Sequence, residues 1–378
     1  MTKIVDIRLR GFEYAIPDGQ EYGIIRGLSR KRNCSIVELT LDDGTVGYGE
    51  AGGPARQLNQ HLALFRSFFV GASAFSFDIV ATQVYQKFYH FGLQNMLTAC
   101  MSGISVALYD ALGKKLALPL HDLIGGRATD RLSCYATTGY YSAGGMEDYE
   151  RQLDSMDRNF RGVKIKIGAN IADDIERTRK AREILGDDIL LMVDINANYT
   201  ADIALESIRR VEKYKIHWCE EPLPPTDERG YAELRARSPI PIATGEALYT
   251  VHDFKRLIEA RAVDVIQPSL IAGGGLAQCK AIALLAQIQN LRVSPSIWGG
   301  GLAIAAGLHY AASLPVWPHT DHAPYPMMIE YDLGASPFRE RMVPTPTPDA
   351  DGLLPVPPGP GLGVVPDFDS VQEFAIAL

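Results

Sequence analysis

The sequence predicts a two-domain protein, in which an α+β domain (residues 1–125) precedes an α/β barrel of the TIM type (residues 126–350). Three observations support this prediction: strand-like segments around a hairpin signal, helical patterns after them, and eight short apolar runs that alternate with helical stretches. Strands followed by helices are typical of an α+β domain, whereas eight strand–helix units in series are typical of a closed (β/α)8 barrel. A length of 378 residues is compatible with about two domains.

The first domain begins with a segment in which apolar Val5, Ile7 and Leu9 alternate with charged residues. This alternation predicts a strand with one buried face. The stretch "SIVELTLDDGTVGYGE" then has two strand-like halves around Asp43-Gly44, a strong hairpin signal. Helical patterns follow in "QLNQHLALFRSFF", "FDIVATQVYQKFY" and "MLTACMSGISVALYDALGKKL".

The second domain is predicted from apolar runs that mostly start about 25 to 30 residues apart, the length of one strand–helix unit. The runs are "LSCYATT", "GVKIKIG", "ILLMVDIN", "IHWCEEP", "IPIATGE", "AVDVIQPS", "LRVSPSIW" and "PMMIEYD". The final segment, residues 351–378, is rich in proline and glycine, and we expect it to return over the surface to the first domain.

Composition argues against several classes of protein. The chain is 47% hydrophobic and 22% charged, as ordinary soluble globular proteins are. A net charge of −8 provides no broad basic surface, so we expect no nucleic-acid partner. The apolar runs look too short or too interrupted by glycine to span a bilayer, and we see no secretory signal, so we expect no membrane association. Five scattered cysteines without C-x-x-C spacing predict reduced thiols in a cytoplasmic protein.

Charged residues stand at the ends of successive apolar runs in the barrel domain. The second run ends at Lys164 and Lys166, the third at Asp194, the fourth at Glu220 and the fifth at Glu246. The intervals from 166 to 194, 194 to 220 and 220 to 246 are 28, 26 and 26 residues, one strand–helix unit each. Because barrel chemistry gathers at the carboxyl ends of the strands, these side chains are predicted to converge on one rim.

Each of these residues has an ordinary explanation when it is considered alone. A lone K-x-K can protect a sheet edge, and a carboxylate at a strand end can cap the next helix. Three carboxylates in register, however, repel one another unless a cation joins them, and oxygen-only ligands favour Mg²⁺ over zinc. We therefore predict Asp194, Glu220 and Glu246 as Mg²⁺ ligands. Glu221 points the opposite way from its neighbour, and we expect it to form a structural ion pair.

The two lysines gain a role beside such a metal site. A free lysine is a poor base at neutral pH, because its pKa is about 10.4. A neighbouring ammonium and a nearby divalent cation both lower that pKa, so that a neutral amine can remove a proton near pH 7. The metal and the other ammonium then stabilise the negative charge that develops. Lys164 and Lys166 beside three carboxylates therefore predict abstraction of a proton α to a carboxylate.

Six motifs occur along the chain: "KIKIG", "VDINANY", "CEEPLPP", "ATGEALY", "DVIQPS" and "WGGGLAIAAGLHYAASLP". In combination they resemble the mandelate racemase and muconate lactonizing enzyme families of the enolase superfamily, and the resemblance covers essentially the full length. It implies an α+β capping domain, completed by the C-terminal segment, on a modified (β/α)7β TIM barrel. It also implies a small-molecule carboxylate as substrate and assembly into a homo-oligomer.

The resemblance further implies roles for individual residues. Lys166 is expected to be the general base and Lys164 to polarise the substrate carboxylate, while the three carboxylates named above hold Mg²⁺. Three more residues are expected to line the substrate site or to contact the substrate: Asn196, Ser296 and Glu330.

The chain departs from the family pattern on the opposite face of the substrate. Mandelate racemase-like members carry an Asp–His pair there and muconate lactonizing-like members a lysine, but this chain has Ser269 and Ser296. A serine without a neighbouring base is a poor proton relay, although it can hydrogen-bond a polar substrate. The loop "WPHTDHAPYP" offers His319, Asp321 and His322 as replacements, or it is a solvated loop with local capping.

A racemase needs acid/base groups on both faces of its substrate, whereas a dehydratase can work with one. The missing pair therefore favours dehydration of a hydroxy acid or acid sugar by a metal-dependent lyase. A racemase or epimerase and a lactone cycloisomerase remain alternatives within the family. A binding protein without turnover is the third, but it would have little use for a lysine activated as a base.

Overall fold

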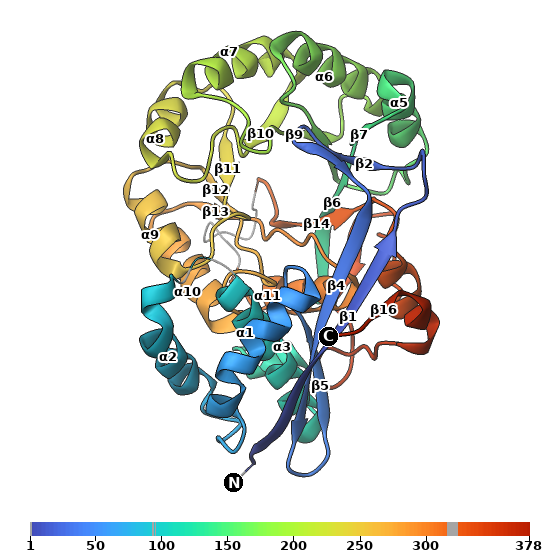
Figure 1. Ribbon diagram of the computed structural model, residues 1–378. Helices are drawn as coiled ribbons and strands as arrows, with labels where there is room; N and C mark the ends of the chain where they lie inside the picture. The colour runs from blue at the N-terminus through green and yellow to red at the C-terminus, as the bar shows by residue number, and fades with distance from the viewer. Residues whose placement is uncertain (1, 93, 95, 316–323) are drawn as a thin grey trace.

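The computed structural model describes residues 2–92, 94, 96–315 and 324–378. A domain of antiparallel strands and helices lies beside a larger domain whose parallel strands are surrounded by helices (Figure 1). The predicted fold class, an α+β capping domain joined to an α/β barrel, is confirmed. The limits assigned to the three segments stay a prediction.

The capping domain contains a four-stranded antiparallel sheet. Its strands in spatial order are β16 (Ala375–Ile376), β1 (Ile4–Ala15), β4 (Lys31–Leu41) and β5 (Val46–Glu50). The predicted alternation holds for Ile7 and Leu9, which are buried, but Val5 is 46% exposed. The pairing of β1 with β4 shifts register between Ile4 and Asp6, and Ile4 is buried in place of Val5.

The predicted hairpin turn at Asp43-Gly44 joins β4 to β5. Gly44 has a φ of +85°, which glycine adopts without the steric cost that a side chain would add. An Asp43 carboxylate oxygen accepts the backbone N–H of Thr45 at 3.0 Å. The sequence signal and the turn geometry therefore agree.

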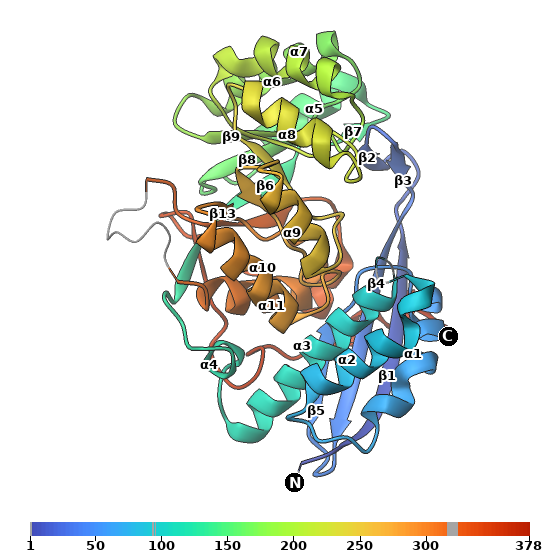
Figure 2. The same ribbon diagram turned by 90° about the vertical axis from the view of Figure 1, so that its left-hand side faces the viewer.

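Helices α1 (Ala55–Phe69) and α3 (Met96–Leu116) lie against the sheet of the capping domain, and α2 (Phe77–Phe88) packs beside α1 (Figure 2). Helix α3 is long and apolar enough to cross a membrane, which corrects the expectation that every apolar run is too short or interrupted. Within the apolar 18-residue stretch of α3, 89% of the residues are buried inside the protein, so α3 is the core helix of this domain. A Cβ on Gly47 of β5 would lie 2.0 Å from the carbonyl oxygen of Ala107, so only glycine permits this close packing.

A small three-stranded sheet connects a loop of the capping domain to the barrel. Its strands are β3 (Gly27–Ser29), β2 (Tyr22–Ile24) and β7 (Tyr141–Ser142), with Gly23 opposite Tyr141. The loop that carries Arg26 is therefore held against the first unit of the barrel.

All eight predicted runs form parallel strands of one curled sheet. In spatial order they are β14 (Met328–Asp332), β6 (Arg131–Thr138), β8 (Gly162–Lys166), β9 (Leu190–Asp194), β10 (Ile216–Glu220), β11 (Ile242–Thr244), β12 (Val265–Ile266) and β13 (Arg292–Val293). The edge strands β13 and β14 are joined by side chains, since the Ser294 hydroxyl donates to the carbonyl oxygen of Met328 at 2.6 Å.

Seven of these strands are followed by a helix on the outside of the sheet (Figure 1). The helices are α5 (Gly145–Asp154), α6 (Ile171–Leu185), α7 (Ala201–Val211), α8 (Glu228–Arg237), α9 (Val251–Glu259), α10 (Leu276–Ile288) and α11 (Gly301–Ala312). The last strand, β14, leads instead into a single π-helical turn, Phe338–Met342. The described residues therefore form a (β/α)7β arrangement, as the resemblance implied, and not eight full units.

The final segment contacts both domains. Strand β15 (Leu353–Pro355) pairs antiparallel with β6 of the barrel, and β16 pairs with β1 of the capping domain. Between them, Leu362 lies in a buried apolar cluster that includes residues of both domains.

Two histidines form a buried pair where α4 (Leu120–Leu123) meets α11. The Nδ1 atoms of His121 and His309 are 2.8 Å apart, and His309 Nε2 lies 3.1 Å from the carbonyl oxygen of Leu362. This arrangement fits a neutral His309 that donates from Nε2 and accepts from His121. Burial lowers the pKa of His309 to about 4, and His309 is fully buried within α11.

Acidification is expected to destabilise the protein through this pair. A histidine whose pKa is lowered by folding contributes stability above its unfolded pKa of about 6.5, and that contribution is lost as the pH falls toward 4. Between pH 7 and pH 5 the loss from His309 is expected to be about 2 kcal/mol in the free energy of unfolding. Urea unfolding of the wild type and of His309→Gln at both pH values measures it. Equal losses in the two proteins would contradict the assignment.

Candidate active site

The register of the parallel strands brings the predicted charged residues together. Lys166 at the end of β8 is the backbone partner of Asp194 at the end of β9, and Asp194 is the partner of Glu220 at the end of β10. Glu246 follows the end of β11 by two residues. The intervals seen in the sequence therefore correspond to neighbouring strand ends on one rim.

The two lysines contact the predicted metal ligands directly. Lys166 Nζ donates to Asp194 Oδ2 at 2.5 Å. Lys164 Nζ contacts Glu220 Oε1 and lies 3.0 Å from Glu330 Oε1 and 3.8 Å from Asp194 Oδ2. Lys164 is fully buried and Lys166 is 6% exposed. Both ammonium groups are thus held among carboxylates, away from solvent.

Without a bound cation, the pKa of both lysines lies above its ordinary value. Burial is the largest influence on the pKa of Lys166 and lowers it, as Lys164 does, but Asp194, Glu246 and Glu220 together raise it above its ordinary value. Lys164 behaves alike, because Glu220 and Glu330 outweigh burial. Without a bound cation the carboxylates therefore favour the protonated lysines, and the lowering of the lysine pKa by Mg²⁺ stays a prediction.

The carboxylates are held by further donors. Glu220 Oε2 accepts from Gln267 Nε2 at 2.6 Å and from Trp218 Nε1 at 3.1 Å. Burial raises the pKa of Glu220 to about 7, although Lys164 acts in the opposite direction. Burial also raises the pKa of Glu246, whose Oε2 accepts the Ser296 hydroxyl at 3.1 Å.

The charge of this cluster fits a divalent cation. Four carboxylates, including Glu330, face two ammonium groups, which leaves a formal charge of −2. Asp194, Glu220 and Glu246 supply oxygen atoms only, the ligand type of Mg²⁺. In the described ranges no three such side chains are grouped closely enough to hold a metal ion, and the lysines contact oxygens of Glu220 and Asp194. Binding a cation would therefore release both lysines from their carboxylates.

A cavity of about 450 Å³ lies between this rim and the capping domain. Its barrel wall includes Asn196, Glu246, Ser269, Ser296 and Trp298. Its other wall comes from the capping domain and includes the start of α1, the end of β5 and a basic stretch before and within β4. Both domains therefore shape the space beside the charged cluster.

The predicted substrate contacts differ in position. Asn196 lines the cavity and has a φ of +50°. Its backbone N–H and its side-chain Nδ2 both donate to the Asp194 carboxylate, while its Oδ1 has no partner. Ser296 also lines the cavity, and its hydroxyl lies 3.0 Å from Glu330 Oε2. Glu330 is 1% exposed and lies beneath Lys164, outside the cavity wall. Direct contact of these three residues with substrate stays a prediction.

Glu221 does not behave as predicted. No ion pair of Glu221 occurs among the described residues; instead it lines the cavity, is 3% exposed and has an Oε1 without a partner. Its φ of +41° turns the chain at the end of β10, so the simple strand alternation does not apply there. Burial raises its pKa well above the ordinary range, and a neutral carboxyl group needs no cationic partner.

Sequence reasoning missed several residues around the site. Gln267 could have been noticed as a polar residue at the end of the "DVIQPS" run. Arg32 and Trp298 gave no signal, because their proximity depends on how the two domains meet. The histidines and aspartate considered as replacements, His319, Asp321 and His322, lie outside the described residues.

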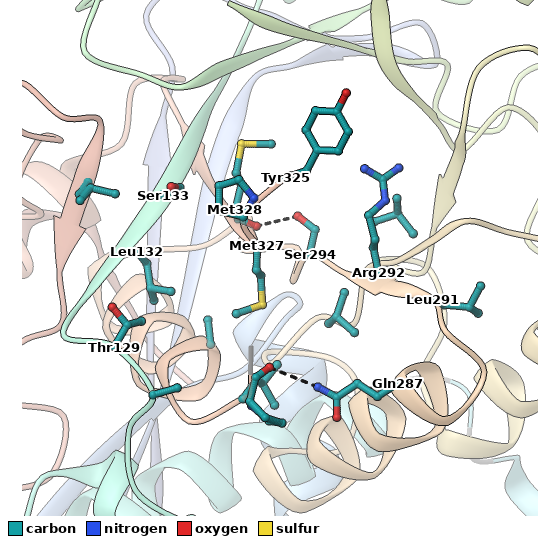
Figure 3. A pocket seen from close by; sticks show the side chains of 18 of the residues that line it. Thr129, Leu132, Ser133, Gln287, Leu291, Arg292, Ser294, Tyr325, Met327 and Met328 are labelled. Carbon is teal, nitrogen blue, oxygen red and sulfur yellow. Dashed lines mark hydrogen bonds between the residues drawn. The ribbon is translucent and has the colours of Figure 1, made fainter. Parts of the chain in front are cut away.

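A second cavity, of about 310 Å³, lies at the opposite ends of the barrel strands (Figure 3). Its wall is mostly apolar and includes Met327, Met328 and Leu291, with Arg292 and Tyr325 beside them. Among the described residues that line it there is no carboxylate. The cluster of lysines and carboxylates lies at the other, carboxyl ends of the strands, where barrel enzymes carry out their chemistry.

Two family models match the chain. "Mandelate racemase / muconate lactonizing enzyme, N-terminal domain" matches residues 23–125, and "Enolase C-terminal domain-like" matches residues 148–370. D-galactarolactone cycloisomerase from Agrobacterium fabrum is 32% identical over 98% of this chain and 98% of its own. Arabinonate dehydratase from Saccharolobus solfataricus is 31% identical over 95% of this chain and 96% of its own.

A solved structure agrees in sequence and in fold. The crystal structure of 3,6-anhydro-D-galactonate cycloisomerase from Zobellia galactanivorans is 32% identical, covers 99% of this chain and 100% of its own, and has a TM-score of 0.87. Matches of this extent, with the lysines and carboxylates gathered on one barrel rim, leave one conclusion. The chain belongs to the mandelate racemase/muconate lactonizing enzyme family of the enolase superfamily.

Proposed function

We propose that this protein is a Mg²⁺-dependent enzyme that removes the proton α to the carboxylate of an acid sugar and eliminates the hydroxyl group on the next carbon. The observation that carries the proposal is the register of Lys166, Asp194 and Glu220 on adjacent strand ends, with Lys164 and Glu246 beside them. Relatives named as arabinonate, L-rhamnonate and L-talarate/galactarate dehydratases support an acid sugar as the substrate class.

Each residue has a defined part in this reaction. Asp194, Glu220 and Glu246 would hold Mg²⁺, which supplies Lewis-acid stabilisation of the charge on the substrate carboxylate. Lys166, relieved of its contact with Asp194, takes the α-proton. Lys164 stays cationic near Glu330 and donates to the substrate carboxylate.

Elimination is expected to use one face of the substrate. By the resemblance, Ser269 and Ser296 occupy the positions of the second acid/base group, and a serine hydroxyl is too weak an acid and too weak a base to transfer the proton alone at pH 7. Lys166 can return the proton it took to the departing hydroxyl, so that water leaves and one base suffices. The electron pair of the C–H bond forms the new double bond as the C–O bond breaks.

A lactone cycloisomerase is the second candidate. The relatives from Agrobacterium fabrum and Zobellia galactanivorans carry cycloisomerase names at 32% identity each. In that reaction the same proton abstraction expels a ring oxygen, and no water is lost. Both reactions would use the same residues of this chain. The two candidate functions therefore differ only in the leaving group, a hydroxyl in dehydration and a ring oxygen in cycloisomerisation.

The proposed function is tested by incubating the Mg²⁺-loaded protein with a panel of acid sugars and their lactones in D₂O. Mass spectrometry separates dehydration, in which the product is lighter by one water, from cycloisomerisation, in which it is an isomer. We also expect a substrate analogue that cannot eliminate to exchange its α-hydrogen with retained configuration, because Lys166 acts on one face only. Inversion in the NMR spectrum of the recovered analogue would reveal a second base and favour an epimerase. If no compound in the panel reacts and none exchanges its α-hydrogen, the proposal is refuted.

The setting of the enzyme is also proposed. All five cysteines are free and buried, which suits a reducing cytoplasm. We infer a homo-oligomer that acts on a small carboxylate without a nucleic-acid or membrane partner.

A further inference from the structure

Three basic residues of the capping domain line the active-site cavity: Arg26, Lys31 and Arg32. Arg26 is exposed and donates to the backbone oxygen of Asn196, and Lys31 is exposed and pairs with Glu13 at 2.8 Å. Arg32 differs from both because it is only 5% exposed. A buried guanidinium at the wall of a cavity is therefore the feature to explain.

Arg32 is fixed on two sides and unsatisfied on a third. Its Nη2 donates to Asp332 Oδ2 at 2.6 Å, and its guanidinium carbon lies 4.3 Å from the centroid of the Trp298 ring, which also lines the cavity. Its Nη1 is buried and has no hydrogen-bond partner. A buried charged donor without an acceptor is costly, and it is rare in folded proteins unless a ligand supplies the acceptor.

The charges around Arg32 leave room for an anion. Arg339 Nη1 donates to the same Asp332 oxygen at 2.7 Å, so two cations share one carboxylate. Glu50 is the carboxylate that the capping domain contributes to this wall, and both of its oxygens already accept backbone N–H groups at the start of α11. Neither carboxylate is placed to satisfy Arg32 Nη1.

Contacts also connect this position to the proposed base. The Tyr140 hydroxyl donates to Asp332 Oδ1 at 2.6 Å, and the centroid of the Tyr140 ring lies 5.8 Å from Lys166 Nζ. Arg32 therefore lines the cavity and is connected to Lys166 through Asp332 and Tyr140. At this position it would meet the far end of a short substrate chain.

We propose that Arg32 Nη1 binds a second carboxylate of the substrate, at the end remote from the reacting carboxylate. The preferred substrates are then aldaric acids, which carry a carboxylate at both ends, over aldonic acids, which carry one. This inference rests on the proposed function for its reacting carboxylate and deepens it by naming the substrate class. Stacking on Trp298 and the bond to Asp332 hold the guanidinium ready, so little ordering remains when the anion binds.

Binding of unreactive probes tests the subsite without turnover. Adipate and hexanoate both have six carbons and differ in the second carboxylate only. With saturating Mg²⁺, calorimetry is expected to show that the wild type binds adipate about 10- to 100-fold more tightly, the usual worth of a charge-assisted hydrogen bond. Arg32→Gln is expected to bring the two affinities together.

Arg339→Gln is the matched control, because it removes the other cation from Asp332 but lies outside the cavity wall. It should keep the preference for adipate. If Arg32→Gln does not fold, Arg32→Lys retains a cation for Asp332 and should still lose most of the preference. Equal affinity for both probes in the wild type, or an unchanged preference in the Arg32 variants, overturns the inference.

Turnover separates this inference from the proposed function. Paired assays compare galactarate with galactonate, and the other six-carbon aldarates with their aldonates. The wild type should show a higher kcat/KM for the diacid of each pair, and Arg32→Gln should abolish this difference. If adipate is preferred but no sugar acid or lactone reacts, the subsite stands and the proposed function fails. If aldonates react as well as aldarates in the wild type, the proposed function stands and the substrate class inferred here is wrong.

Discussion

Lys166→Ala is expected to lower kcat by a factor of about 10² to 10⁴ and to abolish α-hydrogen exchange in D₂O. The reason is geometric: Lys166 Nζ contacts Asp194 Oδ2, which places the amine beside the proposed metal ligands on the barrel rim. NMR detection of exchange together with steady-state kinetics measures both effects.

Lys164→Ala serves as the comparison, because its ammonium lies in the same cluster but faces Glu220 and Glu330. We expect this variant to weaken binding of the substrate carboxylate, so that KM rises as well as kcat falling. Circular dichroism checks that both variants fold. Wild-type exchange in Lys166→Ala would assign the base to another group.

Removing the metal is expected to abolish activity, and Mg²⁺ should restore it after EDTA treatment. Asp194→Asn, Glu220→Gln and Glu246→Gln should each weaken Mg²⁺ binding, by more than the ~10–100-fold loss that follows removal of a group supporting a ligand. Each change removes one negative charge from a cluster whose formal charge of −2 favours a divalent cation. Calorimetric titration with Mg²⁺ gives the affinities.

Glu221→Gln is the matched control for these variants. Glu221 neighbours Glu220 but is not one of the three proposed ligands, so its loss should leave Mg²⁺ affinity within a few-fold of the wild type. If all three ligand variants bind Mg²⁺ as the wild type does, the metal site has been assigned to the wrong residues.

The positions of the charged residues on the barrel rim could be predicted because they depend on strand register. One strand–helix unit separates Lys166, Asp194 and Glu220, and parallel strands turn that interval into contact between neighbours. The contact between Lys166 Nζ and Asp194 Oδ2, at 2.5 Å, could not be predicted in this way. Spacing along the chain does not specify such a distance.

Backbone exceptions and contacts between domains were also beyond the sequence. Glu221 departs from the strand alternation because its φ is positive, and a residue other than glycine gives no sign of a positive φ in the sequence. Val5 turns outward where the pairing of β1 with β4 shifts register. Arg32 lies far along the chain from Trp298 and Asp332, and these residues meet only when the capping domain is docked.

The pairing of β1 with β16 has a consequence for synthesis on the ribosome. Gly11 and Ile376 are backbone partners, so the sheet of the capping domain acquires its edge strand only after almost the whole barrel has been translated. Contacts between such distant parts of a chain slow folding, because a very long loop must close before they form. The nascent capping domain therefore lacks the β16 partner of Gly11 and Phe12 until translation nears residue 376, and an unpaired strand edge favours aggregation.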